Sequence, residues 1–283
     1  MKRTRSLTTV AISTIGAGLW AIVLAAGIPG GAAATAESVA MSAPASFWQK
    51  WSSLRFQARP LFLFSGRVEM KLREEAGRRM IETETRATFL GVELASSRSQ
   101  TTIDAATGRT LEYWDLSKSR GRRYTFAETG YSVERLRPKN GPDAPVTQWE
   151  VTSRRQFAYP APPAEGAPAP PVFDFYGMIL HLRKAPLEKP GDEVTLWVAT
   201  TRGAKPFRIS VGEVRQSHRV FLDLATGRSR TEPVREFRLR ISPADPAASE
   251  EGFLKMEGDT EIWVESESRT LLEIEGKIPK VPG

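Results

Sequence analysis

An alternation of apolar and mostly polar side chains over residues 62–89 most constrains what this chain can fold into. The apolar or small members of its first half are Phe62, Phe64, Gly66, Val68, Met70 and Leu72. Side chains of a β-strand point alternately to the two faces of a sheet, so this period of two predicts a long strand with one buried face. Turn-forming residues at 74–77 and a second alternating run over 81–89 predict that the chain pairs back as a long antiparallel hairpin.

Further segments rich in strand-forming residues follow at short intervals, separated by turn signals. They lie at 92–103, 123–127, 131–137, 146–159, 194–200, 207–211, 261–265 and 271–274. Many short strands between Gly, Pro and Asp turns are typical of antiparallel sandwiches, barrels and strongly curved sheets. We therefore expect a mainly β protein with an antiparallel, strongly curved sheet, folded as a sandwich or open barrel in a single domain over 60–283.

One covering α-helix is expected within this β pattern, near 174–184. Asp174 can cap its first turn, Arg183 and Lys184 suit the negative end of the helix, and Pro186 follows. Its apolar face is formed by Phe175, Met178, Ile179 and Leu182. Because such a stripe usually packs in a core, we expect the helix to cover the apolar face of the sheet.

Two features bear on whether the domain has two halves. The segment 159–172 contains six prolines, so it favours an extended, polyproline-like conformation and cannot pair as a regular strand. It is either a surface loop or a boundary between two halves of the domain, and we favour the loop because the β pattern resumes beyond it. Similar turns at 104–109 and 223–228 could indicate a duplicated half-domain. However, Asp and Gly recur in hairpin turns because the local backbone conformation favours them.

The first 36 residues have the composition of a signal peptide. A basic start with Lys2, Arg3 and Arg5 precedes an almost wholly apolar or small stretch at 7–28, and small-residue cleavage sites such as Ala34-Thr35-Ala36 follow. We expect export to the periplasm or beyond, and a retained anchor is the alternative because the stretch approaches the length of a membrane span. Residues 37–59 then form a polar and aromatic lead-in.

Charge and cysteine content further limit the classes of protein to which this chain can belong. The formal charge of +7 includes the three basic residues of the leader, so the mature chain is only mildly basic. This argues against nucleic acid as a partner and for at most peripheral membrane contact. The chain has no cysteine, so packing rather than disulfides must stabilise the exported domain, and thiolate chemistry and a lipid-bearing cysteine are excluded.

No recognisable catalytic constellation is present. His181 and His218 are the two histidines, and neither has a second histidine at metal-binding spacing. Nucleophile-elbow, phosphate-loop and dinucleotide motifs are missing from the sequence. Adjacent acidic residues are better explained as solvated charge, although acids from distant strands could still serve a wall-polymer hydrolase, the third alternative. We expect no enzyme, metal or cofactor.

The densest basic and aromatic cluster offers a candidate anion site. It consists of Lys118, Arg120, Arg122 and Arg123, beside Trp114 and Tyr124. Guanidinium groups suit the phosphate or carboxylate groups of lipids or envelope polysaccharide. The other interpretation is a solvated hairpin tip, since short charge runs usually face water.

From residue 60 to its C-terminus the chain resembles the exported domain-of-unknown-function family thirty-one-oh-eight. The resemblance rests on the long first hairpin, on Asp174 with Leu182 and Arg183, on Pro190-Gly191-Asp192 before a strand, and on Ile262-Trp263 with Gly276 beyond. It implies a periplasmic or outer-membrane-associated β-rich protein without established catalytic residues.

Aromatic residues on the expected strands motivate a binding hypothesis. We predict an exported, non-enzymatic cell-envelope protein that cradles an apolar or amphipathic, lipid-like ligand. Its candidate ligand-binding residues are Trp114, Tyr124, Trp197, Phe207 and Trp263, most of which would also suit a core. The alternative is a periplasmic assembly or scaffold protein that binds another envelope protein through strand edges or the proline-rich segment.

Overall fold

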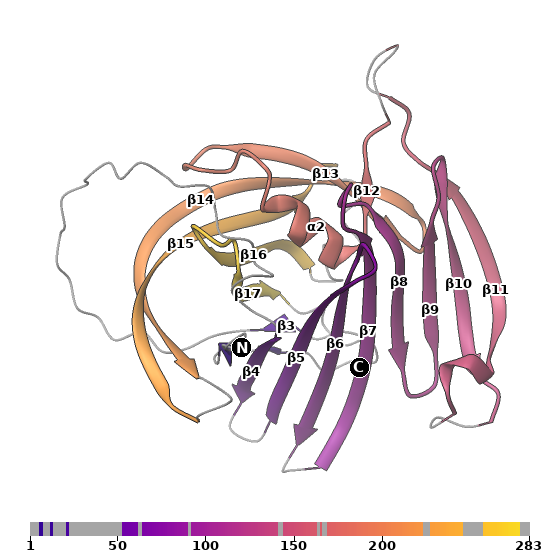
Figure 1. The fold of residues 1–283 in the computed structure, drawn as a ribbon, viewed down its shortest axis with the longest axis horizontal. Helices are drawn as coiled ribbons and strands as arrows, with labels where there is room; N and C mark the ends of the chain where they lie inside the picture. Colours follow the sequence, from indigo (N-terminus) through magenta and orange to yellow (C-terminus); the bar gives the residue numbers. More distant parts are fainter. Residues whose placement is uncertain are drawn as a thin grey trace.

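Two large, mainly antiparallel sheets, a small two-stranded sheet and one α-helix make up most of the part of the chain that the structure describes (Figure 1). The computed structural model describes residues 53–61, 64–89, 92–140, 144–162, 165, 169–222, 227–245 and 257–277, and the short strands β1 (Ser6–Leu7), β2 (Ile12–Ser13) and β3 (Ala21–Ile22). Apart from those strands, the expected leader lies outside the described residues, as do residues 37–52 of the lead-in and 223–226 of the second repeated turn.

The first sheet has eight strands in the order β11-β10-β9-β8-β7-β6-β5-β4, so each strand pairs with its neighbour in sequence. The strands are β4 (Ser53–Leu61), β5 (Phe64–Glu75), β6 (Arg78–Phe89), β7 (Val92–Asp104), β8 (Thr110–Ser117), β9 (Gly121–Phe126), β10 (Gly130–Pro138) and β11 (Trp149–Ala158). A short 3-10 helix, η1 (Val146–Gln148), precedes β11.

The predicted first hairpin is confirmed as β5 and β6, which pair antiparallel from Phe64 opposite Phe89 to Glu75 opposite Arg78. Ala76 and Gly77 make the two-residue turn with φ values of 48° and 73°. Two consecutive positive φ angles match the right-handed twist of the strands, which favours this tight connection.

The second sheet follows the order β12-β13-β14-β15-β16-β17, and β1 pairs with β14 as a seventh strand. Its strands are β12 (Val172–Phe173), β13 (Glu193–Thr200), β14 (Gly203–Leu222), β15 (Ser229–Pro243), β16 (Glu257–Glu265) and β17 (Leu271–Lys277). All neighbours along this path are antiparallel except β12 and β13. The long strands β14 and β15 bend strongly, as Figure 1 shows in orange.

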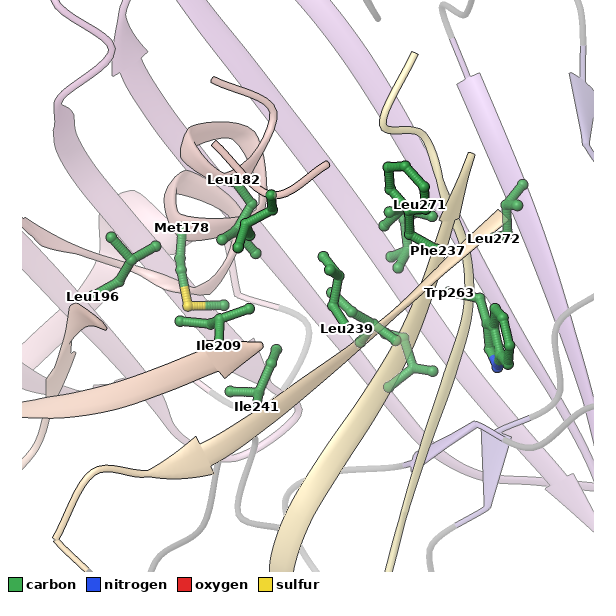
Figure 2. Close-up of a cluster of buried hydrophobic side chains, with 14 of the residues drawn as sticks. Met178, Leu182, Leu196, Ile209, Phe237, Leu239, Ile241, Trp263, Leu271 and Leu272 are labelled. Atoms are coloured by element: carbon green, nitrogen blue, oxygen red, sulfur yellow. The ribbon is translucent and has the colours of Figure 1, made fainter. Parts of the chain in front are cut away.

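Helix α2 (Phe175–Leu182) packs against both sheets. Asp174 caps it as predicted, accepting hydrogen bonds from the backbone N–H groups of Tyr176 and Gly177. Met178 and Leu182 are buried beside Ile209 and Ile241 of the second sheet (Figure 2). The same apolar cluster includes Val68, Met70, Leu72, Ile81 and Ile103 of the first sheet. The mainly β fold with one covering helix is therefore confirmed.

The proline-rich segment joins β11 to β12 and so carries the chain from the first sheet to the second. A second apolar cluster lies near this crossing, formed by Tyr124, Phe126, Tyr131, Val133 and Val172. Over the described residues, no helix has the length and hydropathy needed to cross a bilayer.

Candidate functional site

A pocket of about 820 Å³ opens on the face of the first sheet that points away from α2. Val68, Met70 and Leu72 of β5 face the core, so Glu69 and Lys71, which alternate with them, face the opposite side and line the pocket. Its lining also includes Glu82, Glu84, Arg98, Gln100, Glu112, Trp114, Leu116, Arg123, Leu136, Val146, Trp149 and Val151. The volume is within the usual range for small-molecule sites.

Curvature of the first sheet creates this pocket. Residues of β5 and β11 line it together, although five other strands separate β5 from β11 in the sheet. In a flat sheet these strands would lie roughly 29 Å apart, since neighbouring strands are about 4.8 Å apart. The sheet is instead strongly curled, as a half-barrel, and we call the space it encloses the half-barrel pocket.

One side of the pocket, which we call the apolar wall, consists of Leu116, Leu136, Val146, Trp149 and Val151. A Cβ atom on Gly121 would lie 2.6 Å from Leu116 Cδ2 and 3.0 Å from Trp149 Cζ3, so the bare backbone makes room for the indole ring. The Nε1–H of Trp149 donates a 2.9 Å hydrogen bond to the carbonyl oxygen of Ala144. Gly121 and this hydrogen bond together hold the Trp149 ring in place.

A chain of charged side chains positions Trp114 beside the apolar wall. The guanidinium carbon of Arg123 lies 5.0 Å from the centre of the Trp114 ring, within cation–π range. Arg123 Nε and Arg154 Nε each donate a 2.7 Å hydrogen bond to Glu134, whose side chain is only 3% exposed. Burial opposes the charge of Glu134, but the hydrogen bonds from Arg154 and Arg123 lower the pKa of its carboxyl below the usual value.

The opposite side of the pocket, the charged wall, carries side chains that are paired with one another or with neighbours. Glu69 lies 3.9 Å from Lys71, and Glu82 lies 3.4 Å from Arg73. Glu84 accepts a 2.9 Å hydrogen bond from Arg86 Nε. The pocket is therefore amphipathic, with aliphatic and indole surface on one side and compensated charge on the other.

Three polar side chains between the two walls have no such partner. They are Arg98, Gln100 and Glu112, which we call the polar trio. Among the residues that the structure describes, none of the three makes a hydrogen bond or ion pair through its side chain. Groups of this kind inside a pocket are available to a ligand.

The predicted ligand-binding residues are divided between this pocket and the protein core. Trp114 lines the pocket. Tyr124 is buried in the second apolar cluster, with its ring 5.4 Å from that of Tyr113, and Trp197 packs against the same cluster. Phe207 and Trp263 belong to the main core, and Arg215 lies 3.5 Å above the Trp263 ring.

The predicted anion-contacting residues do not form one cluster. Arg122 and Arg123 are adjacent in β9 and point to opposite faces, so Arg123 lines the pocket while Arg122 lies 3.9 Å from Asp115 on the other face. Lys118 makes a 3.0 Å ion pair with Glu93, and Arg120 is exposed at the turn before β9. The alternation of the strand separates side chains that are neighbours in sequence.

Sequence reasoning missed the polar trio and most of the apolar wall. A signal for the wall was present, since Trp114 and Leu116 occupy the positions of β8 that alternate with the buried face, where polar residues would be expected. No local sequence pattern indicates that Leu116 and Val151 line the same pocket, because only the curl of the sheet brings them to it.

The two histidines lie in different surroundings. His181 packs against Phe173 with ring centres 4.6 Å apart, and burial lowers the pKa of its imidazole. His218 is exposed on β14, opposite Pro233. Within the described residues, no group of three or more His, Asp or Glu side chains is placed to hold a metal ion.

Comparisons with known proteins give one distant structural similarity. No family model matches the chain, and no curated protein matches it. The chain is similar to the crystal structure of a beta-barrel-like protein of domain of unknown function DUF1849 from Brucella abortus, with 11% identity, a TM-score of 0.39, and coverage of 74% of this chain and 80% of that one. That is a different family from the one the sequence resembles, so the specific family stays a prediction.

Proposed function

We propose that this chain is a non-enzymatic binding protein that cradles an amphipathic ligand in the half-barrel pocket. The observation that carries this proposal is the division of one 820 Å³ pocket into an apolar wall and a charged wall. An amphipathic molecule satisfies both sides, because its apolar part removes aliphatic and indole surface from water while its polar part stays hydrogen-bonded.

The apolar wall supports this function because it occupies the side of the sheet that does not form the main core. Leu136 is buried and Trp149 is half-buried on that side, while Val151 is exposed at the rim. A sheet face directed at water normally carries polar side chains. Concave apolar surface rimmed by charge is a common feature of ligand sites.

We also propose that the protein acts in the cell envelope. The basic start, apolar stretch and small-residue sites of residues 1–36 favour export, and an amphipathic ligand fits a protein of the cell envelope. Contact with the membrane would be peripheral once the leader is removed. Fractionation of the native host would test this part, because recovery from the cytosol would overturn it.

The decisive test compares two matched variants. Val151 lines the pocket and Val220 lies on β14 outside it, and each is 47% exposed. Lipid extraction and mass spectrometry of purified full-length protein should recover a bound amphiphile from the unaltered chain and from Val220→Asp, and much less from Val151→Asp. Equal recovery from both variants, or none from the unaltered protein, would refute pocket binding.

A second candidate function rests on β11, the last strand in the order of the first sheet. Most of its side chains are exposed, which suits a strand edge that binds a partner protein by β-augmentation. However, Arg154 and Arg155 and the irregular register opposite Arg135 are features that protect edges from pairing. Cross-linking in cells would favour this function if it gave one stoichiometric partner.

A further inference from the structure

The polar trio lies around Trp114 on one face of β7 and β8. Gln100 is directly opposite Trp114 in the antiparallel pairing, Arg98 is opposite Leu116, and Thr102 is opposite Glu112. Arg98 and Glu112 are therefore diagonal neighbours of the Trp114–Gln100 pair. Diagonal neighbours in such a pair are about 7–8 Å apart. Arg98 and Glu112 lie on opposite sides of the pair, four residues or roughly 14 Å apart along the strands, so a headgroup that contacts both must span the pair.

The chemistry of the trio is mixed. A guanidinium group only donates hydrogen bonds, a carboxylate only accepts them, and a side-chain amide does both. Because Arg98 and Glu112 carry opposite charges on opposite sides of the pair, a phosphate or sulfate could pair only with Arg98 and an ammonium group only with Glu112, and either would leave the other side chain unpaired. An anion at Arg98 would also meet Glu84, which lies directly opposite Arg98 in the pairing of β6 and β7. Hydroxyl groups donate and accept, so they can satisfy all three side chains without a charge conflict.

The other charged side chains of the pocket are already paired and do not change the preference for an uncharged headgroup. Glu69, Glu82 and Glu84 of the charged wall each have a cationic partner, and Arg123 is bound by Glu134. An ionic headgroup bound at these side chains would have to displace one of these partners. A neutral polar group would leave all of them in place.

Trp114 adds a flat surface beside the trio. An indole ring supplies a large apolar face with fixed geometry, and the C–H face of a sugar ring can pack on it while the sugar hydroxyls reach polar neighbours. The ring, one donor, one acceptor and one amide therefore form the elements of a site for a sugar.

We propose that the ligand of the half-barrel pocket carries an uncharged, hydroxyl-rich headgroup of the sugar type, bound by Arg98, Gln100 and Glu112 beside Trp114, with its apolar tail on the apolar wall. This inference rests on the proposed function and specifies the ligand class of the same pocket. It separates neutral, glycolipid-like amphiphiles from amphiphiles whose headgroup carries a net charge.

Three amphiphiles with the same tail test the headgroup. Full-length protein is titrated below the critical micelle concentration with dodecyl maltoside, dodecyl phosphate and dodecyltrimethylammonium, and binding is followed by calorimetry and tryptophan fluorescence. Because a charged headgroup leaves at least one of these polar side chains unpaired, dodecyl maltoside should bind about tenfold more tightly than either charged amphiphile. A preference for a charged headgroup would overturn the inference.

A charge reversal tests the residues. Glu112→Arg should reduce affinity for dodecyl maltoside and raise affinity for dodecyl phosphate, because it places two guanidinium groups beside the bound headgroup. Arg155→Glu is the matched control, since Arg155 is exposed on the opposite face of the sheet, across from Val133. An unchanged preference in Glu112→Arg would show that the trio does not bind the headgroup.

The outcomes distinguish the two proposals. If all three amphiphiles bind equally and Val151→Asp removes binding, the pocket holds amphiphiles but the sugar inference is wrong. If none binds, both the pocket function and the headgroup inference fail.

Discussion

Asp174 Oδ2 accepts a 2.6 Å hydrogen bond from Thr101 Oγ1, which joins the start of α2 to β7. Thr110 Oγ1 donates a second hydrogen bond, of 2.8 Å, to Asp174 Oδ1. Burial raises the pKa of Asp174, while these hydroxyls and the N–H groups of Gly177 and Tyr176 act to lower it. One buried carboxyl thus caps the helix and fixes it to the first sheet.

We expect Asp174→Ala to destabilise the fold by about 3 kcal/mol, because it removes a helix cap and leaves two buried hydroxyls without their acceptor. Chemical denaturation measures the loss. Asp192→Ala is the control, since Asp192 accepts hydrogen bonds of 2.8 Å and 3.0 Å from the backbone of Glu188 and Lys189 in a turn but joins no helix to a sheet. Equal losses in the two variants would mean that the link to β7 and β8 contributes nothing.

Gly177→Ala should also destabilise the protein, although Ala in a helix is normally better than Gly by about 1 kcal/mol. A Cβ atom there would lie 2.3 Å from Thr110 Oγ1 and 2.7 Å from Asp174 Oδ1, so one of these groups must move. We expect a loss of roughly 1–3 kcal/mol, as for other overpacked core sites. In Gly212→Ala the nearest atom is 3.5 Å away, and thermal unfolding of that control should change much less.

Gly121→Ala is expected to weaken ligand binding more than it weakens the fold. Its Cβ atom would displace the Trp149 ring or Leu116 Cδ2, both on the apolar wall. Affinity for dodecyl maltoside should fall about threefold to tenfold, equivalent to roughly 1 kcal/mol. Fluorescence titration measures the affinity, and a shifted emission spectrum without ligand would report the moved indole. Unchanged affinity would contradict the assignment of this wall.

Glu273 predicts an unusual pH dependence of stability. Burial and the neighbouring Glu275 raise the pKa of Glu273 to about 7 from an ordinary value of 4.5, although Arg219 opposes the shift. Between these two pH values the folded state holds a proton that the unfolded chain has released, so this group reduces the free energy of unfolding as pH rises.

Replacing Glu273 with Gln should therefore flatten the stability profile over that window. Denaturant unfolding at several pH values compares Glu273→Gln with the unaltered protein and with Glu193→Gln, an exposed acid on β13. A slope that persists in Glu273→Gln would show that another group is responsible.

The elements that were predictable from the sequence are those specified by neighbouring residues. They are the period of two over β5 and β6, the turn at Ala76 and Gly77, and Asp174 before an apolar helical stripe. Each of these signals depends on residues only a few positions apart in the chain. Backbone geometry alone then dictates strand, turn and helix.

The candidate site was predictable only in part. Trp114 and Arg123 were recognised as unusual, and they meet because cross-strand register places them opposite each other. Tyr124 was grouped with them, but it follows Arg123 directly and so points into the core. Aromatic residues occur on both faces of β8, where Tyr113 faces the second apolar cluster and Trp114 faces the pocket, so composition could not distinguish the pocket from the core.

Local residue patterns determined that this chain forms long antiparallel strands with one capped helix, because alternation and capping depend on near neighbours. The tertiary structure alone decided which face of the first sheet became the core and which became the half-barrel pocket. That choice depends on the packing of α2 and the second sheet against one face and on the curl that brings β5 and β11 around the other, and both join residues far apart in the chain.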